Sequence, residues 1–456
     1  MDRETTVADT GLTAGLARLA AQGPAVPPGH PALDAATRAF IDTIGVALAG
    51  WCEPPVGLLA ESLVEGVEAR SLLGGRRLAA RDAALLNGMA GHVLDYDDVA
   101  VHGHPSVVLV PAILAEAQRL GRSGGDALRA YALGYEAWAE LGRRESGSYH
   151  LGAWHPTAML GTVAATVAAA ALNRLDAETA IHAIAMAASF AGGLIANFGS
   201  PAKPLQAGRA AASAIEAVSL ARAGLTGSPT ALESPHGFLR AISPGGAVDV
   251  DGPLRLAAKA DDLRLLSEGL SVKRYPVCYA SHRAIDGAID LAIQERLRPE
   301  DVARITVALG RAPAATLRFP HPETSTQARF SLNHNVAAAL TDRAVGFAQL
   351  SDDYIHRPEI AALYALTETE LVDDECPEQP GLARFDRVRI ETRDGGRLDS
   401  GPIRYPRGHA RLPLCDADLD AKFLDCARHG QVAEGPALLE RLRALETLTD
   451  LSELVA

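Results

Sequence analysis

Apolar residues recur every three to four positions through most of the first 270 residues, which is the spacing of packed helices. Alanine and other small residues dominate these segments, so neighbouring helices can approach closely. Glycine-rich stretches such as 121–125 separate them. The pattern predicts an all-helical domain with helices over residues 36–49, 82–96, 107–120, 126–143, 157–172, 177–189, 204–223 and 238–242.

The pattern changes after about residue 269. Residues 281–295 repeat the helical spacing, whereas 301–309 and 385–392 alternate between apolar and polar positions, as strands do. An Asp-Gly pair then signals a hairpin with a return strand at 397–400. Two shorter helical segments lie between the strands, around 335–341 and 358–364. These features predict a smaller α+β domain.

Helical spacing returns from Leu419 to the end of the chain. This last part could pack back onto the first domain. We therefore expect a mainly α protein whose large helical domain comprises residues 1–268 and 404–456. The α+β domain, residues 269–403, would be inserted between them as a lid.

Charge and composition exclude several classes of function. The 456 residues include 43 basic and 56 acidic side chains, a net charge of −13, which argues against nucleic acid or an anionic membrane as the main partner. The apolar runs reach about a dozen residues, whereas a membrane span needs about 20. The polar N-terminus does not resemble a signal peptide, and five scattered cysteines without a CxxC pair fit a reducing compartment. We expect a soluble, cytoplasmic protein.

Motifs for common cofactors are absent. The chain has no GxxxxGK[ST] and no GxGxxG between a strand and a helix, so nothing supports nucleotide binding. The G-x-S-x-G match at 121–125 joins two predicted helices, whereas a nucleophile elbow follows a strand. HExxH is absent, and no third ligand is spaced to complete a metal site with His102 and His104. No metal or organic cofactor is expected.

Four polar side chains open apolar helices. His104, His155 and Lys203 each precede a proline, which favours the first helical position and extends the residue before it; His282 starts a fourth helix. Helix N-termini present free N–H groups that attract anions and disfavour imidazolium. The four residues could therefore line one anion pocket with neutral histidines. Taken singly, each could instead be a helix cap or a solvated side chain.

Two further groups are candidates. Asp95 opens an acidic run, 95–98, just before His104, and a carboxylate there could orient a histidine. The alternative is an ordinary solvated loop. Lys273 and Arg274 lie at the junction of the two predicted domains, where the guanidinium could bind a substrate carboxylate. The alternative is a charged hinge.

At these residues the chain resembles the MmgE/PrpD family, which includes 2-methylcitrate dehydratase, cis-aconitate decarboxylase and an iminodisuccinate epimerase. The matching segments keep their order along nearly the whole chain: FIDTIGVALAG (40–50), LLNGMAGHVLDYDD (85–98), HPS (104–106), WHPTAMLGT (154–162), FGSPAKPLQAGRAA (198–211), LSVKRYPVCYASHRAID (270–286), FSLNHNVAAAL (330–340) and LDAKFLDCA (419–427).

The resemblance implies a helical domain built from both chain ends, an α+β lid, a homodimer, an active site between the domains and no metal or organic cofactor. It implies that the catalytic residues are Asp95, His104, His155, Lys203 and His282. We expect substrate contacts from Lys273, Arg274 and Gln206.

The chain departs from the aconitate decarboxylases at three places. At the position of Val99 the aconitate decarboxylases share a threonine, and at the position of Gln206 they tend to have a histidine. The loop between Asp95 and His104 also looks one residue shorter. These differences bear on which reaction the chain performs.

The predicted chemistry is removal of a proton next to a carboxylate of a small di- or tricarboxylate. Lys203, Arg274, neutral histidines and helix N-termini would stabilise the added negative charge, and His104 or His155 would be the base or acid. A dehydratase- or decarboxylase-type lyase is the first hypothesis. An isomerase, specifically an epimerase of an amino-dicarboxylate, is the second, and a non-catalytic anion-binding protein is the third.

Overall fold

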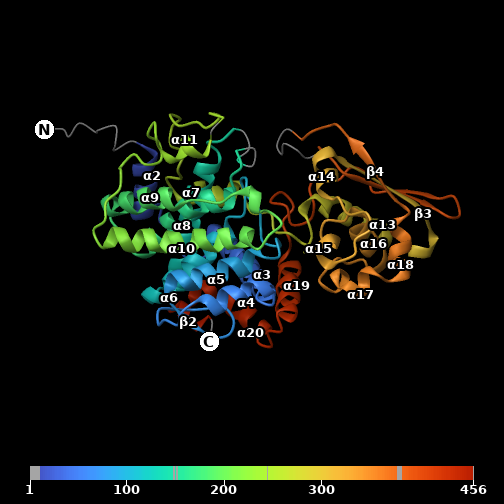
Figure 1. Ribbon diagram of the computed structural model, residues 1–456, viewed down its shortest axis with the longest axis horizontal. Helices are drawn as coiled ribbons and strands as arrows, with labels where there is room; N and C mark the ends of the chain where they lie inside the picture. Colours follow the sequence, from blue (N-terminus) through green and yellow to red (C-terminus); the bar gives the residue numbers. More distant parts are fainter. Residues whose placement is uncertain (1–10, 147–148, 150–151, 244, 377–382, 455–456) are drawn as a thin grey trace. The chain divides into compact units, whose positions relative to one another are not determined.

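The computed structural model describes residues 11–146, 149, 152–243, 245–376 and 383–454 (Figure 1). The chain forms two compact units. One contains the residues up to Ser271 together with those from Asp416 onward, and the other is Val272–Cys415.

The second unit ends later than residue 403, the boundary expected from the sequence. The segment after that residue packs within the second unit, where Arg407 pairs with Asp286 and Asp290 at 3.2 and 2.6 Å. In addition, the backbone N–H of Val272 donates to the carbonyl of Gly408 at 2.8 Å.

Helices build the first unit. Those predicted from apolar spacing are present, and within the described residues the structure adds three short or N-terminal helices and a two-stranded hairpin of β1 (Ala69–Arg70) and β2 (Arg77–Leu78). The helices are α2 (Leu12–Gln22), α3 (Pro31–Gly50), α4 (Pro54–Ser62), α5 (Ala80–His92), α6 (Ser106–Leu120), α7 (Gly124–Gly142), α8 (Pro156–Leu172), α9 (Ala177–Phe190), α10 (Ala202–Arg222), α11 (Phe238–Ile242), α12 (Arg264–Ser267), α19 (Asp416–His429) and α20 (Gly435–Arg443).

The helix expected over 82–96 ends early, at His92. Asp95 adopts a left-handed backbone with φ of 53°, which is incompatible with continuing the helix. The acidic run therefore leaves the helix axis and forms a turn. This turn carries the first residues of the candidate site.

Glycines allow the helices around this turn to touch. A Cβ on Gly88 of α5 would lie 2.7 Å from the Cα of Gly208 of α10, and a Cβ on Gly208 would lie 2.1 Å from the carbonyl oxygen of Leu85. Residues with side chains cannot approach so closely. The contact holds the first turn of α10 beside the end of α5.

The C-terminal helices complete the first unit. In Figure 1 the red helix α19 lies beside the blue helix α3, and the two helices pack against each other. Their contact includes a buried ion pair in which Lys422 Nζ lies 2.5 Å from Asp42 Oδ1. Residues from the two ends of the chain thus form one core.

The second unit is a four-stranded sheet with helices. Its strands are β3 (Val302–Gly310), β4 (Thr367–Val372), β5 (Arg387–Thr392) and β6 (Arg397–Asp399), in the order β4-β3-β5-β6. β4 runs parallel to β3, and the other pairs are antiparallel. The helices are α13 (His282–Gln294), α14 (Arg311–Thr316), α15 (Ser325–Ala328), α16 (Leu332–Asp342), α17 (Asp352–Ile355) and α18 (Pro358–Tyr364).

A single core joins these elements. It contains Ile285 of α13, Val307 of β3, Val336 of α16 and Ile390 of β5, all fully buried. The strands β3, β5 and β6 were predicted, but β4 was missed because its side chains are mostly exposed and carry no apolar alternation.

The protein is therefore mainly α, as predicted. Within the described residues, no single helix has the length and apolar character needed to cross a membrane; α3 and α4, bent by 91° at their junction, meet the criterion only when counted together.

Candidate active site

Three helix starts converge in the first unit. His155 is the N-cap of α8, His104 lies two residues before α6, and Lys203 lies in the first turn of α10. The backbone N–H of His104 donates to Thr157 Oγ1 at 3.2 Å, which ties the start of α6 to the first turn of α8. The prediction that these residues open helices is confirmed.

Asp95 lies between Lys203 and His104. Lys203 Nζ donates to Asp95 Oδ1 at 2.5 Å, and His104 Nε2 lies 3.8 Å from the same oxygen. Lys203 Nζ also lies 5.3 Å from the ring centroid of Phe198, within range of a cation–π interaction. The structure thus brings together three of the predicted catalytic residues.

Asp97 forms the base of the site. Its carboxylate is fully buried, and His92 Nδ1 lies 3.0 Å from both of its oxygens. His104 Nδ1 lies 3.0 Å from Oδ2. Burial opposes ionisation of Asp97, but attraction from the two imidazoles outweighs it and holds the pKa well below its usual value. The ionised carboxylate can only accept, so His92 donates its Nδ1–H.

The sequence analysis missed the roles of His92 and Asp97. The only local signal was their position in the segment that also holds Asp95. His92 occupies the last turn of α5, and its fully buried ring lies 4.8 Å from that of His104 and 5.6 Å from that of His155, centroid to centroid. Burial lowers the pKa of His92 to about 4, although Asp97 acts in the opposite direction.

His155 is held neutral. Its exposed fraction is 2%, and burial, assisted by the nearby His92 and Lys203, lowers its pKa to about 2. Its Nδ1 lies 2.7 Å from Oε1 of Gln206, and its ring meets Phe198 edge-on at 5.0 Å. Gln206, predicted to contact substrate, is thus in contact with a catalytic candidate.

A second buried layer supports the acidic turn. Lys422 Nζ donates to the carbonyl of Tyr96 at 2.9 Å and lies 3.9 Å from the centroid of its ring. Ser106 donates to Asp98, and burial and the nearby Asp42 raise the pKa of Asp98 well above its usual value. Burial therefore shifts the pKa of Asp98 upward, whereas the two imidazoles shift the pKa of its neighbour Asp97 downward.

Family models match both parts of the chain. The MmgE/PrpD N-terminal domain matches residues 14–251, and the MmgE/PrpD C-terminal domain matches residues 275–440. The chain belongs to the MmgE/PrpD family.

Relatives of this MmgE/PrpD protein include cis-aconitate decarboxylases. The Homo sapiens protein is 28% identical over 435 residues, which cover 91% of this chain and 88% of the human protein. The Mus musculus protein is 28% identical over 406 residues, 85% of this chain and 80% of the mouse protein. The Aspergillus terreus protein is 24% identical over 404 residues, 84% of this chain and 81% of the fungal protein.

The site of this MmgE/PrpD protein also contains potential metal ligands. Ligand atoms of His92, Asp95, Asp97 and His104 lie within 4.8 Å of one another. The sequence spacing offered no third ligand to accompany His102 and His104, whereas the fold places His92 of α5 and the acidic turn beside His104. His102, the other histidine considered, is not in this group. As placed, Asp95 is engaged by Lys203 and Asp97 by His92, so a cation would compete with both contacts.

The remaining predicted residues belong to the second unit. His282 is fully buried at the start of α13, where its Nε2 donates to the carbonyl of Val277 at 3.2 Å. Lys273 is buried, and the guanidinium carbon of Arg274 lies 5.8 Å from the ring centroid of Tyr275. These residues remain predictions based on the family resemblance.

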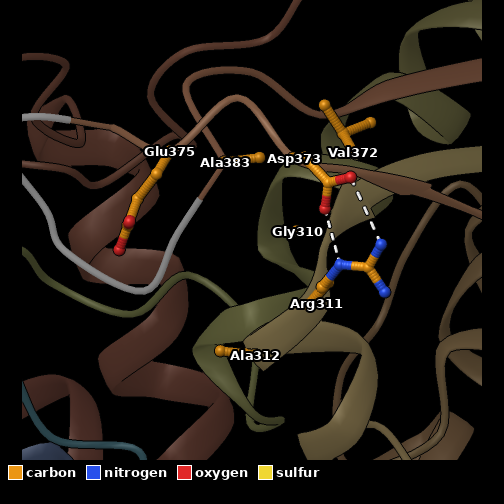
Figure 2. A pocket seen from close by; sticks show the side chains of 7 residues that line it. All are labelled: Gly310, Arg311, Ala312, Val372, Asp373, Glu375 and Ala383. Carbon is orange, nitrogen blue, oxygen red and sulfur yellow. Dashed lines mark hydrogen bonds and ion pairs between the residues drawn. The ribbon is translucent and has the colours of Figure 1, made fainter.

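A hollow of about 240 Å³ lies at the ends of β3 and β4, and none of the predicted site residues lines it. Figure 2 shows Arg311 turned toward Asp373, with Nε 2.5 Å from Oδ1 and Nη2 3.2 Å from Oδ2. The guanidinium is thus neutralised, and Glu375 adds negative charge. This hollow does not suit a polyanion.

A cavity of about 360 Å³ in the first unit is lined by Trp154 and Met159, among other residues. Its polar lining consists of serine hydroxyls and the indole and imidazole of Trp154 and His236, without lysine or arginine. It therefore offers no full positive charge to a carboxylate. The cluster around Asp95 and Asp97 is the better candidate for chemistry.

Proposed function

We propose that the protein is a cofactor-independent lyase that removes a proton next to a carboxylate of a small di- or tricarboxylate. The observation that supports this most strongly is the cluster of Lys203, Asp95 and His104 at three converging chain segments. The cis-aconitate decarboxylases among its relatives support an aconitate- or methylcitrate-type reaction.

Proton transfer is assigned to His104. The sequence left the choice between His104 and His155 open, but an imidazole with a pKa near 2 is a poor base at neutral pH. His104 has Asp97 at Nδ1 and Asp95 near Nε2, so both ring nitrogens have an acceptor close by. This arrangement suits a ring that gains and loses a proton during turnover.

Lys203 would stabilise the negative charge that develops on the substrate. Its ammonium is paired with Asp95, and a substrate carboxylate would share or replace that contact. A positioned cation lowers the activation free energy most where negative charge develops in the transition state. On the family resemblance, Arg274 and Lys273 would bind further carboxylates, His282 would take part in catalysis, and the active protein would be a homodimer.

A proton-exchange assay tests the reaction. The purified protein is incubated in D₂O with a panel of di- and tricarboxylates, and each proton next to a carboxylate is followed by NMR. A new alkene or a decarboxylated product is the expected result. Exchange without net product would indicate an epimerase instead, and binding of citrate without exchange or product for any compound would indicate an anion-binding protein.

Matched variants test the site. Lys203→Met is expected to reduce kcat/KM about 10²–10³-fold, the range for loss of one oxyanion-stabilising donor. Arg209→Met removes an exposed cation from the same helix, where Arg209 lies 3.6 Å from Glu216, and should leave activity unchanged. Equal activity of the two variants would contradict the proposal.

A further inference from the structure

The orientation of the Gln206 amide is fixed by the backbone. Its Nε2 donates to the carbonyl of Leu194 at 3.1 Å. That carbonyl is held in place because the segment around Leu194 bonds to the segment before α8: Ile195 N–H donates to Ala153 at 3.1 Å, and His155 N–H donates to Gly193 at 3.0 Å. Turning the amide over would place two oxygens against each other, so Oε1 must face His155.

This orientation determines which nitrogen of His155 carries the proton. Gln206 Oε1 lies 2.7 Å from Nδ1, and an amide oxygen only accepts, so Nδ1 is an N–H donor. In a neutral ring, Nε2 then has a lone pair and no hydrogen. The lowered pKa of His155 agrees with a neutral ring. Nε2 makes no hydrogen bond to the described residues, so its lone pair has no partner among them.

Gly193 makes this contact possible. A Cβ at this position would lie 3.0 Å from Gln206 Oε1, 3.2 Å from His155 Cβ and 2.9 Å from Ala158 Cβ. A larger residue would crowd both side chains and force its neighbours to shift. The carbonyl of Leu194, the absence of a side chain at Gly193 and the amide of Gln206 therefore together set the orientation of the His155 ring.

We propose that Gln206 makes His155 a hydrogen-bond acceptor that selects substrates carrying a hydroxyl or N–H donor beside their carboxylates. Gln206 is thus a positioning residue, and His155 determines specificity. A fully ionised polycarboxylate without such a group has only acceptors. Such a ligand would leave Nε2 desolvated and without a hydrogen-bond donor. The lost hydrogen bond would weaken binding strongly. The proposal rests on the proposed function only for the anionic nature of the substrate.

An acceptor at Nε2 of His155 distinguishes among the candidate substrates. Ionised cis-aconitate carries no hydrogen-bond donor, whereas a hydroxy-tricarboxylate such as citrate carries one. The acceptor at His155 therefore favours binding of a hydroxy acid over binding of ionised cis-aconitate. An amino- or imino-dicarboxylate also offers a donor and is the other class that fits.

The first test reads the proton position directly and needs no activity. Protein labelled with ¹⁵N-histidine is studied by long-range ¹H–¹⁵N NMR, and the His155 signals are assigned by their loss in His155→Asn. Nδ1 should show the shift of a protonated nitrogen and Nε2 that of an unprotonated one, without titration between about pH 5 and 8. A protonated Nε2, or titration in that range, would overturn the proposal.

The second test measures selection with two ligands that differ in one hydroxyl group. Citrate and tricarballylate share the same three carboxylates, and only citrate has the hydroxyl. Calorimetry on the full-length protein should give about tenfold tighter binding of citrate, the value of one well-placed hydrogen bond. Equal affinities would overturn the selection by His155.

Variants link the preference to Gln206. Gln206→Leu should reduce the citrate preference to less than about twofold, because Nδ1 then has no acceptor that holds the proton there. Gln118→Leu is the matched control, because Gln118 is also half-buried on a helix of the first unit and accepts from Arg70 N–H at 2.9 Å. A preference that survives in Gln206→Leu contradicts the proposal.

The two proposals fail in different ways. If neither citrate nor tricarballylate binds at millimolar concentration, the proposed carboxylate chemistry is wrong. The nitrogen shifts of His155 then decide by themselves whether Gln206 holds the ring as an acceptor.

Discussion

The ammonium of Lys422 donates a hydrogen bond to the backbone carbonyl of Tyr96, a residue 326 positions earlier in the chain. Tyr96 lies between Asp95 and Asp97, which face His104 and Lys203. Lys422 also neutralises the buried Asp42. Helix α19 thus supports the turn that carries both site carboxylates.

Lys422→Met is expected to lower both stability and activity. Removing one partner of a buried ion pair typically costs about 3–5 kcal/mol, because the other charge is left unpaired. Chemical denaturation measures this loss. The double variant Asp42→Asn with Lys422→Met should recover much of the stability, since no lone charge remains. Its kcat should stay low because the bond to Tyr96 is still missing; full recovery of kcat would show that this bond does not position the turn.

Asparagine at position 97 should reduce activity strongly, whereas asparagine at position 98 should leave it nearly unchanged. Asp97→Asn replaces an ionised carboxylate that faces two imidazoles, so we expect kcat to fall about 10²–10⁴-fold, the range for acid–base catalysis. Asp98→Asn replaces a carboxyl whose pKa is raised well above its usual value by burial, which favours the protonated form, so its activity should stay within about threefold of wild type if the Ser106 contact is kept. Steady-state kinetics and melting temperatures of both variants decide this, and similar losses in both would refute the charge assignment.

Gly208→Ala should disturb the site by separating the helices α10 and α5, which pack beside it. Its new Cβ would lie 2.1 Å from the carbonyl of Leu85 and force α10 away from α5, at a cost of about 1–3 kcal/mol. Lys203 would move with α10, so kcat/KM should fall as well. Gly57→Ala is the control: no atom lies within 4 Å of its Cβ, and it lies within α4, where alanine should stabilise by about 0.5–1 kcal/mol. A Gly208→Ala variant as stable and active as wild type would contradict the close packing.

The buried neutral histidine predicts acid sensitivity. His155 has a pKa of about 2 in the folded state and about 6.5 when unfolded, so the unfolded chain binds one more proton between these values. The stability from this residue is present above about pH 6.5 and is lost as pH falls below it, by up to about 1.4 kcal/mol per pH unit. In urea unfolding from pH 7 to pH 5, His155→Gln should show a smaller loss than wild type. An identical pH dependence would mean that His155 titrates normally.

Local patterns predicted most of the helices and three strands of the sheet. Apolar spacing succeeded where helices are buried on one face or throughout, as in α8. It failed for β4, whose side chains face solvent, and at the end of α5, where Asp95 turns left-handed. The His155-Pro156 signal correctly marked the start of α8, because proline acts on the residues next to it. Pro204 does not take the first position of α10, because that helix already begins at Ala202.

The sequence by itself determined which residues stand at helix starts and which segments are buried, since these depend on neighbours a few positions away. Only the tertiary structure decided that the pKa of Asp97 is lowered and that of Asp98 is raised, that Gln206 orients His155, and that Lys422 supports Tyr96. The physical reason is that charge states and proton positions depend on burial and on partners brought together from distant segments. Neither is encoded in the local spacing of residues.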